Sequence, residues 1–422
     1  MMSWIEVIPK SSTRNKKDLL SMSDRTLKKL ASRTLPFQES IIREMTRVGE
    51  ETGAINLSQG LPDYDSPERV LTSAIGAVYS GHNQYSFPFG DEQFRQAIAQ
   101  KSARINQITA DPMREITVTC GVSEAIMAAF FALTDPGDEA ILFEPWYENY
   151  LPACYLSGVT PRFVPMRLPG FRIDLDEVQK AVNPKTRLMV INTPHNPTGR
   201  VLNREELTGL AKICQKYGLI AITDEIYEFI LFDGRKHLSP GSLPGMEDRT
   251  VTISGLGKTF AVTGWRVGWA IAPPPLTQLI RKVHDYLTIC APTPLQIAGT
   301  TALNSTESTF YTKMSAEYQR RRETLLEGLT KGGFHYQTPE GAYYVMADFS
   351  AISWPSGKYQ QTDWSVDRQF AEFLAREIGV AVVPGSSFYM NPTEDLRLIR
   401  INFAQSPANI KQAATKLAAI SK

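Results

Sequence analysis

A β-rich run opens into the stretch SGLGKTF (residues 254–260) and then WRVGW (residues 265–269), which together present one lysine and one arginine. The glycines allow the backbone to turn sharply and to approach a ligand closely. The amine of Lys258 can form a Schiff base with a carbonyl, and the guanidinium of Arg266, eight positions later, can hold a phosphate. An aldehyde and a phosphate on one small molecule describe pyridoxal phosphate. The alternative is a glycine-rich turn whose two cations are simply solvated.

Length and composition indicate an ordinary globular chain with more than one core. The 422 residues exceed the size at which a single core usually stops growing, so two domains are expected. Apolar residues make up 42% of the chain, and a net charge of +1 offers no general attraction for nucleic acid or an acidic membrane. The apolar runs are far shorter than a membrane span. We therefore expect neither nucleic acid nor membrane as a partner.

The four cysteines lie far apart and form no CxxC pair. This spacing argues against a zinc site or a disulfide framework, so we expect no bound metal and a reducing, cytoplasmic compartment. The N-terminal residues 1–34 carry eight basic and three acidic residues and no apolar signal core. A transit peptide is one interpretation, but the acids favour a solvated or loosely docked extension.

Seven short apolar runs alternate with helix-length segments from residue 116 onward. The runs cover residues 116–119, 140–143, 162–165, 188–191, 219–223, 251–254 and 269–272. Runs that are apolar throughout suit strands buried on both faces, and the intervening lengths suit crossover helices. The pattern predicts an α/β fold with a mostly parallel seven-stranded sheet.

Polar side chains collect where three of these runs end, which is where ligands bind in parallel sheets. Residues 120–124 open a helix whose free N–H groups and dipole suit a phosphate. The run NTPHNPTG (192–199) and the run DEIYE (224–228) each follow a predicted strand. Either could be ordinary loop chemistry, because Asn-Pro is a common turn and Asp a common cap, but three such clusters together indicate a site.

The flanking segments predict a smaller domain of α+β type. Helices are expected in it over residues 36–49, 306–332 and 365–378, and strands near residue 55 and over 341–346, 380–383 and 397–403. Residues 67–80 and 91–104 are also expected to be helical, but they precede the runs of the large sheet. The three arginines at 320–322 are expected to form a solvated helix face. An aromatic loop at residues 82–90 suggests an interface or the wall of a site.

With these motifs in their order and spacing, the sequence resembles the class I/II pyridoxal-phosphate-dependent aminotransferases of fold type I. The resemblance runs from about residue 36 to the C-terminus, and its matches are residues 192–199, residues 223–228, the stretch from Lys258 to Arg266, and Arg400 within IRINF (399–403). It implies a fold type I enzyme with three parts. These are an extension of residues 1–35, a small α+β domain from residues 36–66 and 305–422, and a large cofactor-binding α/β domain of residues 67–304.

The resemblance implies three catalytic residues, which are Lys258, Asp224 and Tyr227. Lys258 would bond to the cofactor and then shuttle protons, and its amine must be uncharged to attack, so nearby cations and burial should lower its pKa. Asp224 would pair with the pyridine nitrogen and make the cofactor an electron sink. Asn196 and Tyr227 would donate to the phenolic oxygen.

Other residues acquire binding roles from the same resemblance. The backbone of Val122 and Ser123, with Arg266, would hold the phosphate, and Tyr147, rather than its neighbour Trp146, would stack on the ring. Tyr85 would reach a phosphate across a homodimer interface.

The substrate α-carboxylate would be clamped by Arg400, with Gly60 and Asn196 nearby. One position departs from the family. Many relatives carry a phosphate-binding serine three residues before the lysine, where this chain has Gly255. Ser254, one step earlier, is the candidate replacement, and otherwise the phosphate would depend more on Ser123, Arg266 and backbone amides.

The implied activity is the exchange of an amino group between an amino acid and a 2-oxo acid by a ping-pong route. A cysteine-conjugate β-lyase would use the same fold and cofactor, because the same carbanion expels a leaving group when one is present. A regulatory protein that senses a ligand with this fold is a third interpretation, but the N-terminal extension is too short for a winged helix-turn-helix.

Within the family, the chain is most similar to the branch that includes kynurenine/glutamine and methionine aminotransferases. The similarity lies in residues 56–63, in His195, and in residues 283–288. Only Arg33 and Arg43 are candidates for binding a second substrate carboxylate, and neither is convincing. Aromatic and amide-capable side chains suit a large neutral substrate, and the candidates are Tyr85, His284 and Phe388. Methionine, glutamine, phenylalanine or kynurenine are therefore expected as donors, with aspartate as the alternative.

Overall fold

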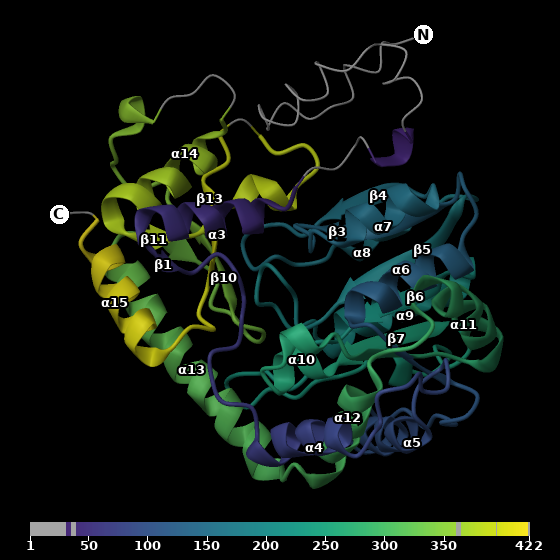
Figure 1. Cartoon of the computed structure of the whole chain (residues 1–422). Coiled ribbons are helices and arrows are strands. Elements are labelled where there is room, and N and C mark those ends of the chain that lie inside the picture. Colours follow the sequence, from purple (N-terminus) through teal and green to yellow (C-terminus); the bar gives the residue numbers. More distant parts are fainter. Residues whose placement is uncertain (1–30, 35–38, 360–363, 394, 421–422) are drawn as a thin grey trace.

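The computed structural model describes residues 31–34, 39–359, 364–393 and 395–420 (Figure 1). A seven-stranded sheet with the order β2-β8-β7-β6-β5-β3-β4 forms the right-hand part of that view. Its strands are β2 (Ile116–Thr119), β3 (Glu139–Glu144), β4 (Thr160–Pro165), β5 (Thr186–Asn192), β6 (Ile220–Asp224), β7 (Thr250–Gly255) and β8 (Gly268–Ile271). Only β8 runs antiparallel to its neighbours, so the predicted fold class is confirmed.

Helices cover both faces of this sheet because its strands alternate apolar side chains between two cores. In β5, Met189 and Ile191 pack into one cluster, whereas Leu188 and Val190 pack into another. The first cluster includes α9 (Arg204–Tyr217), which begins at a capping box formed by Asn203 and Glu206. The other helices of this region are α4 (Glu68–Tyr79), α5 (Glu92–Lys101), α6 (Val122–Leu133), α7 (Tyr150–Ser157), α8 (Leu175–Ala181), α10 (Leu256–Thr259), α11 (Pro274–Thr288) and α12 (Thr293–Ser305).

A second group of elements lies on the left in Figure 1. It holds a four-stranded sheet with the order β12-β13-β10-β9 and a short parallel pair of β1 with β11. The strands are β1 (Ile55–Asn56), β9 (His335–Tyr336), β10 (Tyr344–Asp348), β11 (Val380–Ala381), β12 (Val383–Pro384) and β13 (Leu398–Asn402). The helices are α3 (Ile41–Thr52), α13 (Ser308–Lys331), α14 (Val366–Phe373) and α15 (Pro407–Ala418). The two-domain division made from the sequence stays a prediction, and most of the extension 1–35 lies outside the described residues.

The solvated face expected for the three arginines of α13 is wrong for two of them. Arg320 is exposed, but Arg321 and Arg322 are buried at 5% and 4% exposure. The Arg321 guanidinium donates to three carbonyl oxygens, and Arg322 forms a bidentate pair with Asp233. Both side chains bind residues of loops that are remote in the sequence. Helical periodicity does not reveal such tertiary contacts.

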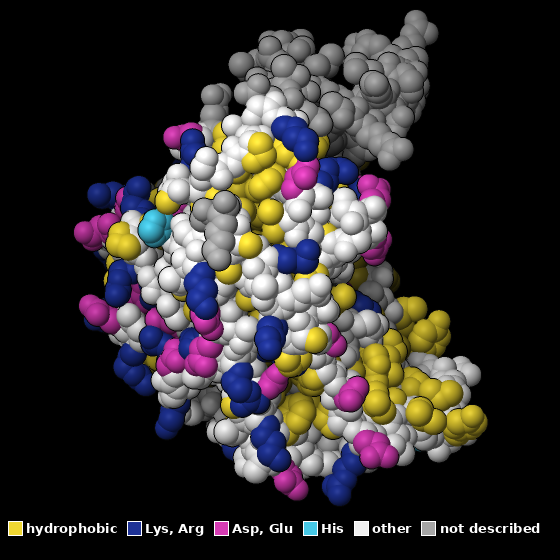
Figure 2. Space-filling model, turned by 90° about the vertical axis from the view of Figure 1, so that its left-hand side faces the viewer, with side chains coloured by type: hydrophobic (Ala, Val, Ile, Leu, Met, Phe, Trp, Pro, Cys, Tyr) yellow, Lys and Arg dark blue, Asp and Glu magenta, His cyan; other side chains and the backbone are white. Residues whose placement is uncertain are grey.

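Several large apolar side chains remain on the surface of α4 and of the loop that follows it. They are Leu71, Ile75, Val78, Tyr79, Tyr85 and Phe87. Figure 2 shows apolar side chains gathered at the lower right of that view. Such groups often mark an interaction surface. Among the described residues, none of the helices has the length and apolar character needed to cross a membrane.

Candidate active site

A pocket with an empty volume of about 650 Å³, open solvent included, lies where β5 and β6 end and α6 begins. This is the position at which ligands bind in open α/β sheets. The lining residues are Gly121, Val122, Ser123, Tyr147, Asn192, Asn196, Asp224, Ile226, Tyr227, Gly257, Lys258, Thr263, Arg266 and Val267. The structure therefore brings together five segments that are far apart in the sequence.

Lys258 enters the pocket from the short helix α10. Its Nζ donates to the carbonyl oxygen of Gly60 at 3.0 Å. Burial lowers the pKa of Lys258 to about 8, Arg400 and Arg266 add to the effect, and Asp224 opposes it. A Cβ at position 60 would lie 2.1 Å from the Tyr344 hydroxyl oxygen, so the close approach of this strand end requires glycine.

Asp224 ends β6 and is buried at 2% exposure. Its Oδ2 accepts a hydrogen bond from the Tyr150 hydroxyl at 2.8 Å. Burial raises the pKa of Asp224 to about 6, although the bonds from Tyr150 and the Ile226 amide oppose the rise. Two titratable groups in one pocket thus have strongly shifted pKa values, which is a frequent property of functional sites.

Asn192 positions two parts of this site from the end of β5. Its Nδ2 donates to the carbonyl oxygen of Asp224 at 2.9 Å, and its Oδ1 accepts from the Asn196 amide at 2.8 Å. The asparagine is therefore a side-chain link between the Asp224 strand and the Asn-Pro loop.

One end of the pocket is cationic and rich in free amides. Helix α6 begins after Gly121, which has φ of +80° and provides no side-chain cap, and the first residues of the helix, Val122 and Ser123, line the pocket. A Cβ on Gly121 would lie 2.5 Å from Nη2 of Arg266. Ser123 accepts a hydrogen bond from Asn149 at 2.9 Å. This arrangement suits a phosphate group.

The serine of the lysine turn points elsewhere. The Ser254 hydroxyl donates to Oε1 of Glu228 at 2.7 Å, and Ser254 is absent from the pocket lining. A side chain at Gly255 would begin 2.8 Å from the carbonyl oxygen of Val267. The cationic end of the pocket is therefore formed by Arg266 and the first residues of α6, without Ser254.

Arg400 is buried beside the pocket, where hydrogen bonds and two aromatic rings hold its guanidinium. Its Nη1 donates to Oδ1 of Asn196 at 3.0 Å, and its Nη2 donates to the carbonyl oxygen of Ser58 at 2.6 Å. The guanidinium lies between two rings, with centroids at 4.5 Å for Tyr344 and 4.9 Å for Phe388. Its Nε is buried and has no partner among the described residues, so one donor remains for a ligand.

The aromatic side chains divide between the pocket and the core. Tyr147 and Tyr227 line the pocket, and the Tyr227 hydroxyl shares a hydrogen bond of 3.0 Å with that of Tyr344. Trp146 instead stacks on Phe163 in the core. Tyr85 is 75% exposed and lies apart from the pocket of its own chain.

His195 and His284, which the sequence suggested for the site, are both held by hydrogen bonds within the protein. His195 is buried, its Nδ1 shares a 2.7 Å hydrogen bond with Thr198, and burial lowers its pKa to about 3. His284 is held between Glu124 and the Pro88 carbonyl, away from the pocket lining. Neither imidazole ring lines the pocket of its own chain, so neither is placed to contact a substrate side chain there.

Sequence reasoning missed several residues of the site. Tyr150, which binds Asp224, follows Tyr147 by three positions and carries no motif of its own. Thr263, which lies between Lys258 and Arg266 in the sequence, lines the pocket. Asn192 also lines it, and the sequence indicated it only as the first residue of the run 192–199. Their roles depend on contacts across the sheet, although an Asn at a strand end could have indicated Asn192.

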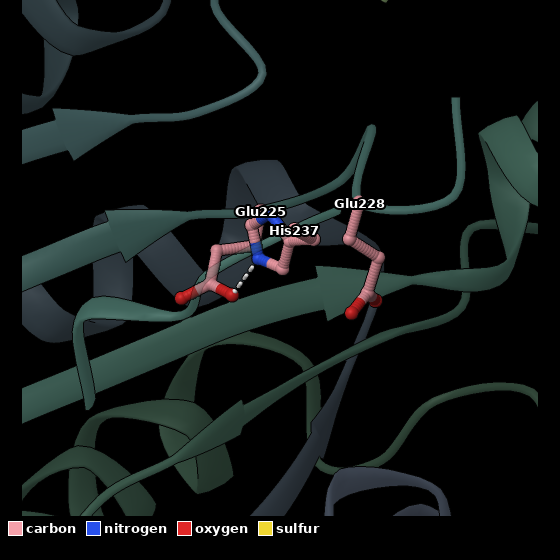
Figure 3. Close-up of side chains that lie close together, drawn as sticks. All are labelled: Glu225, Glu228 and His237. Atoms are coloured by element: carbon pink, nitrogen blue, oxygen red, sulfur yellow. Dashed lines mark hydrogen bonds and ion pairs between the residues drawn. The ribbon is translucent and has the colours of Figure 1, made fainter. Parts of the chain in front are cut away.

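A buried polar network lies behind the site (Figure 3). Glu225 accepts from His237 Nε2 at 2.5 Å, and Glu228 forms an ion pair with Lys101. The carboxylate oxygens of both glutamates all have partners, which include Asn106, Ser239 and Ser254. Three such ligand groups could hold a cation, but the Lys101 ammonium already provides the positive charge. The network therefore supports the ends of β6 and β7.

Comparison with known proteins gives a consistent family. Residues 52–417 match the family described as aminotransferase class I and II. The chain is 36% identical over 402 residues to a probable N-succinyldiaminopimelate aminotransferase of Mycobacterium tuberculosis, covering 93% of this chain and 98% of that one. It is 36% identical over 378 residues to the methionine aminotransferase of Escherichia coli, covering 90% and 95%. The solved structure of the N-succinyldiaminopimelate aminotransferase from Mycobacterium tuberculosis has a TM-score of 0.87 at 35% identity, covering 93% and 100%.

Proposed function

The chain belongs to the class I and II aminotransferase family, whose members exchange an amino group between an amino acid and a 2-oxo acid, and we propose that it does so with pyridoxal 5'-phosphate. The observation that supports this cofactor is the pairing of Lys258 and Asp224 in one pocket, with pKa values lowered to about 8 and raised to about 6. A cationic end, formed by Arg266 and the start of α6, completes the pocket.

The residues present match the cofactor group by group. The amides of Val122 and Ser123 and the Arg266 guanidinium would hold the phosphate, Tyr147 would lie on the ring, and Asp224 would accept from the pyridine nitrogen. Bound there, the cofactor would supply an aldehyde for an amine and a ring that withdraws electrons from the substrate α-carbon.

Lys258 supplies the base. Because burial and two arginines lower its pKa to about 8, a minority of the amine, far more than for an ordinary lysine, is uncharged near neutral pH and can take a proton from the substrate α-carbon. The hydrogen bond to Gly60 directs Nζ across the pocket. Asp224, as a buried carboxylate, would stabilise positive charge on a ligand, and Tyr227 and Asn196, which line the same pocket, would offer hydrogen bonds to it.

Arg400 would bind the substrate α-carboxylate. Its guanidinium plane is fixed by the two rings that sandwich it, and its buried Nε is available to a carboxylate oxygen. Gly60 and Asn196 lie against the same region, because Asn196 already binds Arg400 and Gly60 binds Lys258.

We propose a large neutral amino donor, with methionine, glutamine, phenylalanine or kynurenine as candidates. Arg33 and Arg43 are exposed and do not line the pocket, so neither is placed to pair a second carboxylate in its own chain. A distal carboxylate buried without a partner would be costly. The similarity to a methionine aminotransferase supports the same choice. Aspartate transamination and cysteine-conjugate β-elimination are the alternatives on this fold.

We also propose a homodimer with shared sites in the cytoplasm. Tyr85 is exposed, yet its loop is firmly held, because Thr293 donates to the Gln84 carbonyl and Gln296 donates to the Ser86 hydroxyl. An exposed aromatic side chain on a fixed loop, beside the apolar surface of α4, is suited to a second copy of this chain. The four free cysteines support a reducing compartment.

The test combines cofactor attachment with turnover. Borohydride reduction of the protein with pyridoxal phosphate, followed by peptide mapping, should label Lys258, and Lys258→Ala should lose turnover. Label on another lysine would refute the assignment of Lys258 as the residue that binds the cofactor. Donors are then compared by kcat/KM with one 2-oxo acid acceptor. If aspartate exceeds the neutral donors by more than about tenfold, the substrate proposal is wrong, whereas keto-acid-independent release of a β-substituent would indicate a lyase.

A further inference from the structure

His284 is a buried histidine whose two ring nitrogens both face acceptors. Its Nδ1 lies 2.6 Å from Oε1 of Glu124, and its Nε2 lies 2.8 Å from the carbonyl oxygen of Pro88. The side chain is fully buried. A carbonyl oxygen only accepts, and Oε1 of Glu124 already accepts from the Thr288 hydroxyl at 2.9 Å. Both ring nitrogens can donate to these two acceptors at once only in the imidazolium form.

The two partners of His284 belong to two different segments, one at the cationic end of the chain's own pocket and one in the loop that the proposed dimer would present to the other copy. Glu124 is in the first turn of α6, and its Oε2 accepts from the Cys120 amide, which closes the turn around Gly121. Pro88 belongs to the loop that carries Tyr85. One side chain of α11 thus connects the phosphate end of the pocket to the exposed aromatic loop.

We propose that His284 is a positioning residue that donates to Glu124 and Pro88 at once and so sets the affinity of the site for the phosphate group of its cofactor. This inference rests on the proposed function. The phosphate-binding amides at the start of α6 can act together only when that turn is held in place. A charged hydrogen bond on each side of the ring keeps the turn and the loop at a constant separation.

The charge of His284 makes this contact dependent on pH. Burial opposes protonation, but the hydrogen bond and charge of Glu124, the Pro88 carbonyl and the charge of Asp285 outweigh it and raise the pKa of His284. Because the folded-state pKa is raised, the contribution is present at low pH and is lost as pH rises through that value. Above it, one ring nitrogen no longer donates and faces an acceptor.

The experiment compares two ligands that share Lys258 but differ in the phosphate. Dissociation constants for pyridoxal phosphate and for pyridoxal are measured by absorbance with the wild type, His284→Gln and the exposed control His335→Gln. We expect His284→Gln to weaken the binding of pyridoxal phosphate by at least about tenfold, which is the scale of a lost charged hydrogen bond. The binding of pyridoxal should remain almost unchanged. Equal loss for both ligands, or no loss for either, would overturn the proposal.

A second measurement needs no variant and covers the case in which His284→Gln does not fold. The ratio of the two dissociation constants is followed in the wild type upward from about pH 7, where most of the phosphate is doubly ionised. Titration of Lys258 cancels in this ratio, so we expect the preference for the phosphate to fall as pH rises, and a flat ratio contradicts the role. A wild type that attaches neither ligand to Lys258 would refute the proposed cofactor instead.

Discussion

Lys258 and Asp224 owe their chemistry to burial, which shifts the pKa of the amine down and that of the carboxyl up. Asp224→Ala should leave attachment of the cofactor to Lys258 largely intact but slow the proton-transfer half-reaction by about 10²–10³-fold or more. The reason is the loss of a fixed charge in a site of low dielectric. Stopped-flow absorbance with an amino donor measures this step. Near-normal transamination by the variant would refute the role of Asp224.

The Tyr150 hydroxyl donates a 2.8 Å hydrogen bond to the Asp224 carboxylate and so favours its ionised form. That bond lowers the pKa of Asp224 against burial, with Lys258 also lowering it and Glu225 raising it. Tyr150→Phe should therefore raise the pKa of Asp224, so activity should be lost at a higher pH on the acidic side of the kcat/KM profile. Tyr155→Phe, on the same helix, is the matched control and should leave the profile in place. Superimposable profiles for both variants would exclude this role of Tyr150.

At the scale of elements, the phosphate end depends on how closely the turn before α6 approaches β8. Gly121 has φ of +80°, and a Cβ there would meet the Arg266 guanidinium at 2.5 Å. Gly121→Ala should displace Arg266 and so weaken the binding of pyridoxal phosphate much more than the binding of pyridoxal. Gly53→Ala is the control for backbone strain, because Gly53 has φ of +66° with nothing within 4 Å. Equal effects of the two substitutions on ligand binding would argue against a steric role for Gly121.

At the scale of the whole molecule, the exposed Tyr85 and the apolar side chains of α4 predict sites shared between two copies. Two inactive variants, Lys258→Ala and Tyr85→Ala, should regain partial activity when they are unfolded together and reassembled. A mixed dimer would contain one site with both residues intact. Sedimentation and turnover of the mixture measure this result. A fully active monomer at working concentration would contradict it.

The sequence by itself determined the seven strands, their mostly parallel order, and the family, because these depend on local apolar runs and short motifs. It also indicated most of the pocket lining, since strand ends of a parallel sheet meet at one edge. Positions such as Lys258 and Asp224 could be found because each directly follows a recognisable strand.

Only the tertiary structure decided where individual side chains bind. Tyr150 reaches Asp224 across 74 positions of chain, Ser254 turns to Glu228, and Arg321 is buried against carbonyl oxygens of distant loops. His284, an expected substrate contact, is instead held by Glu124. Local periodicity specifies which face of an element is buried, whereas the partner of a buried polar group is set by packing between elements that are remote in the sequence.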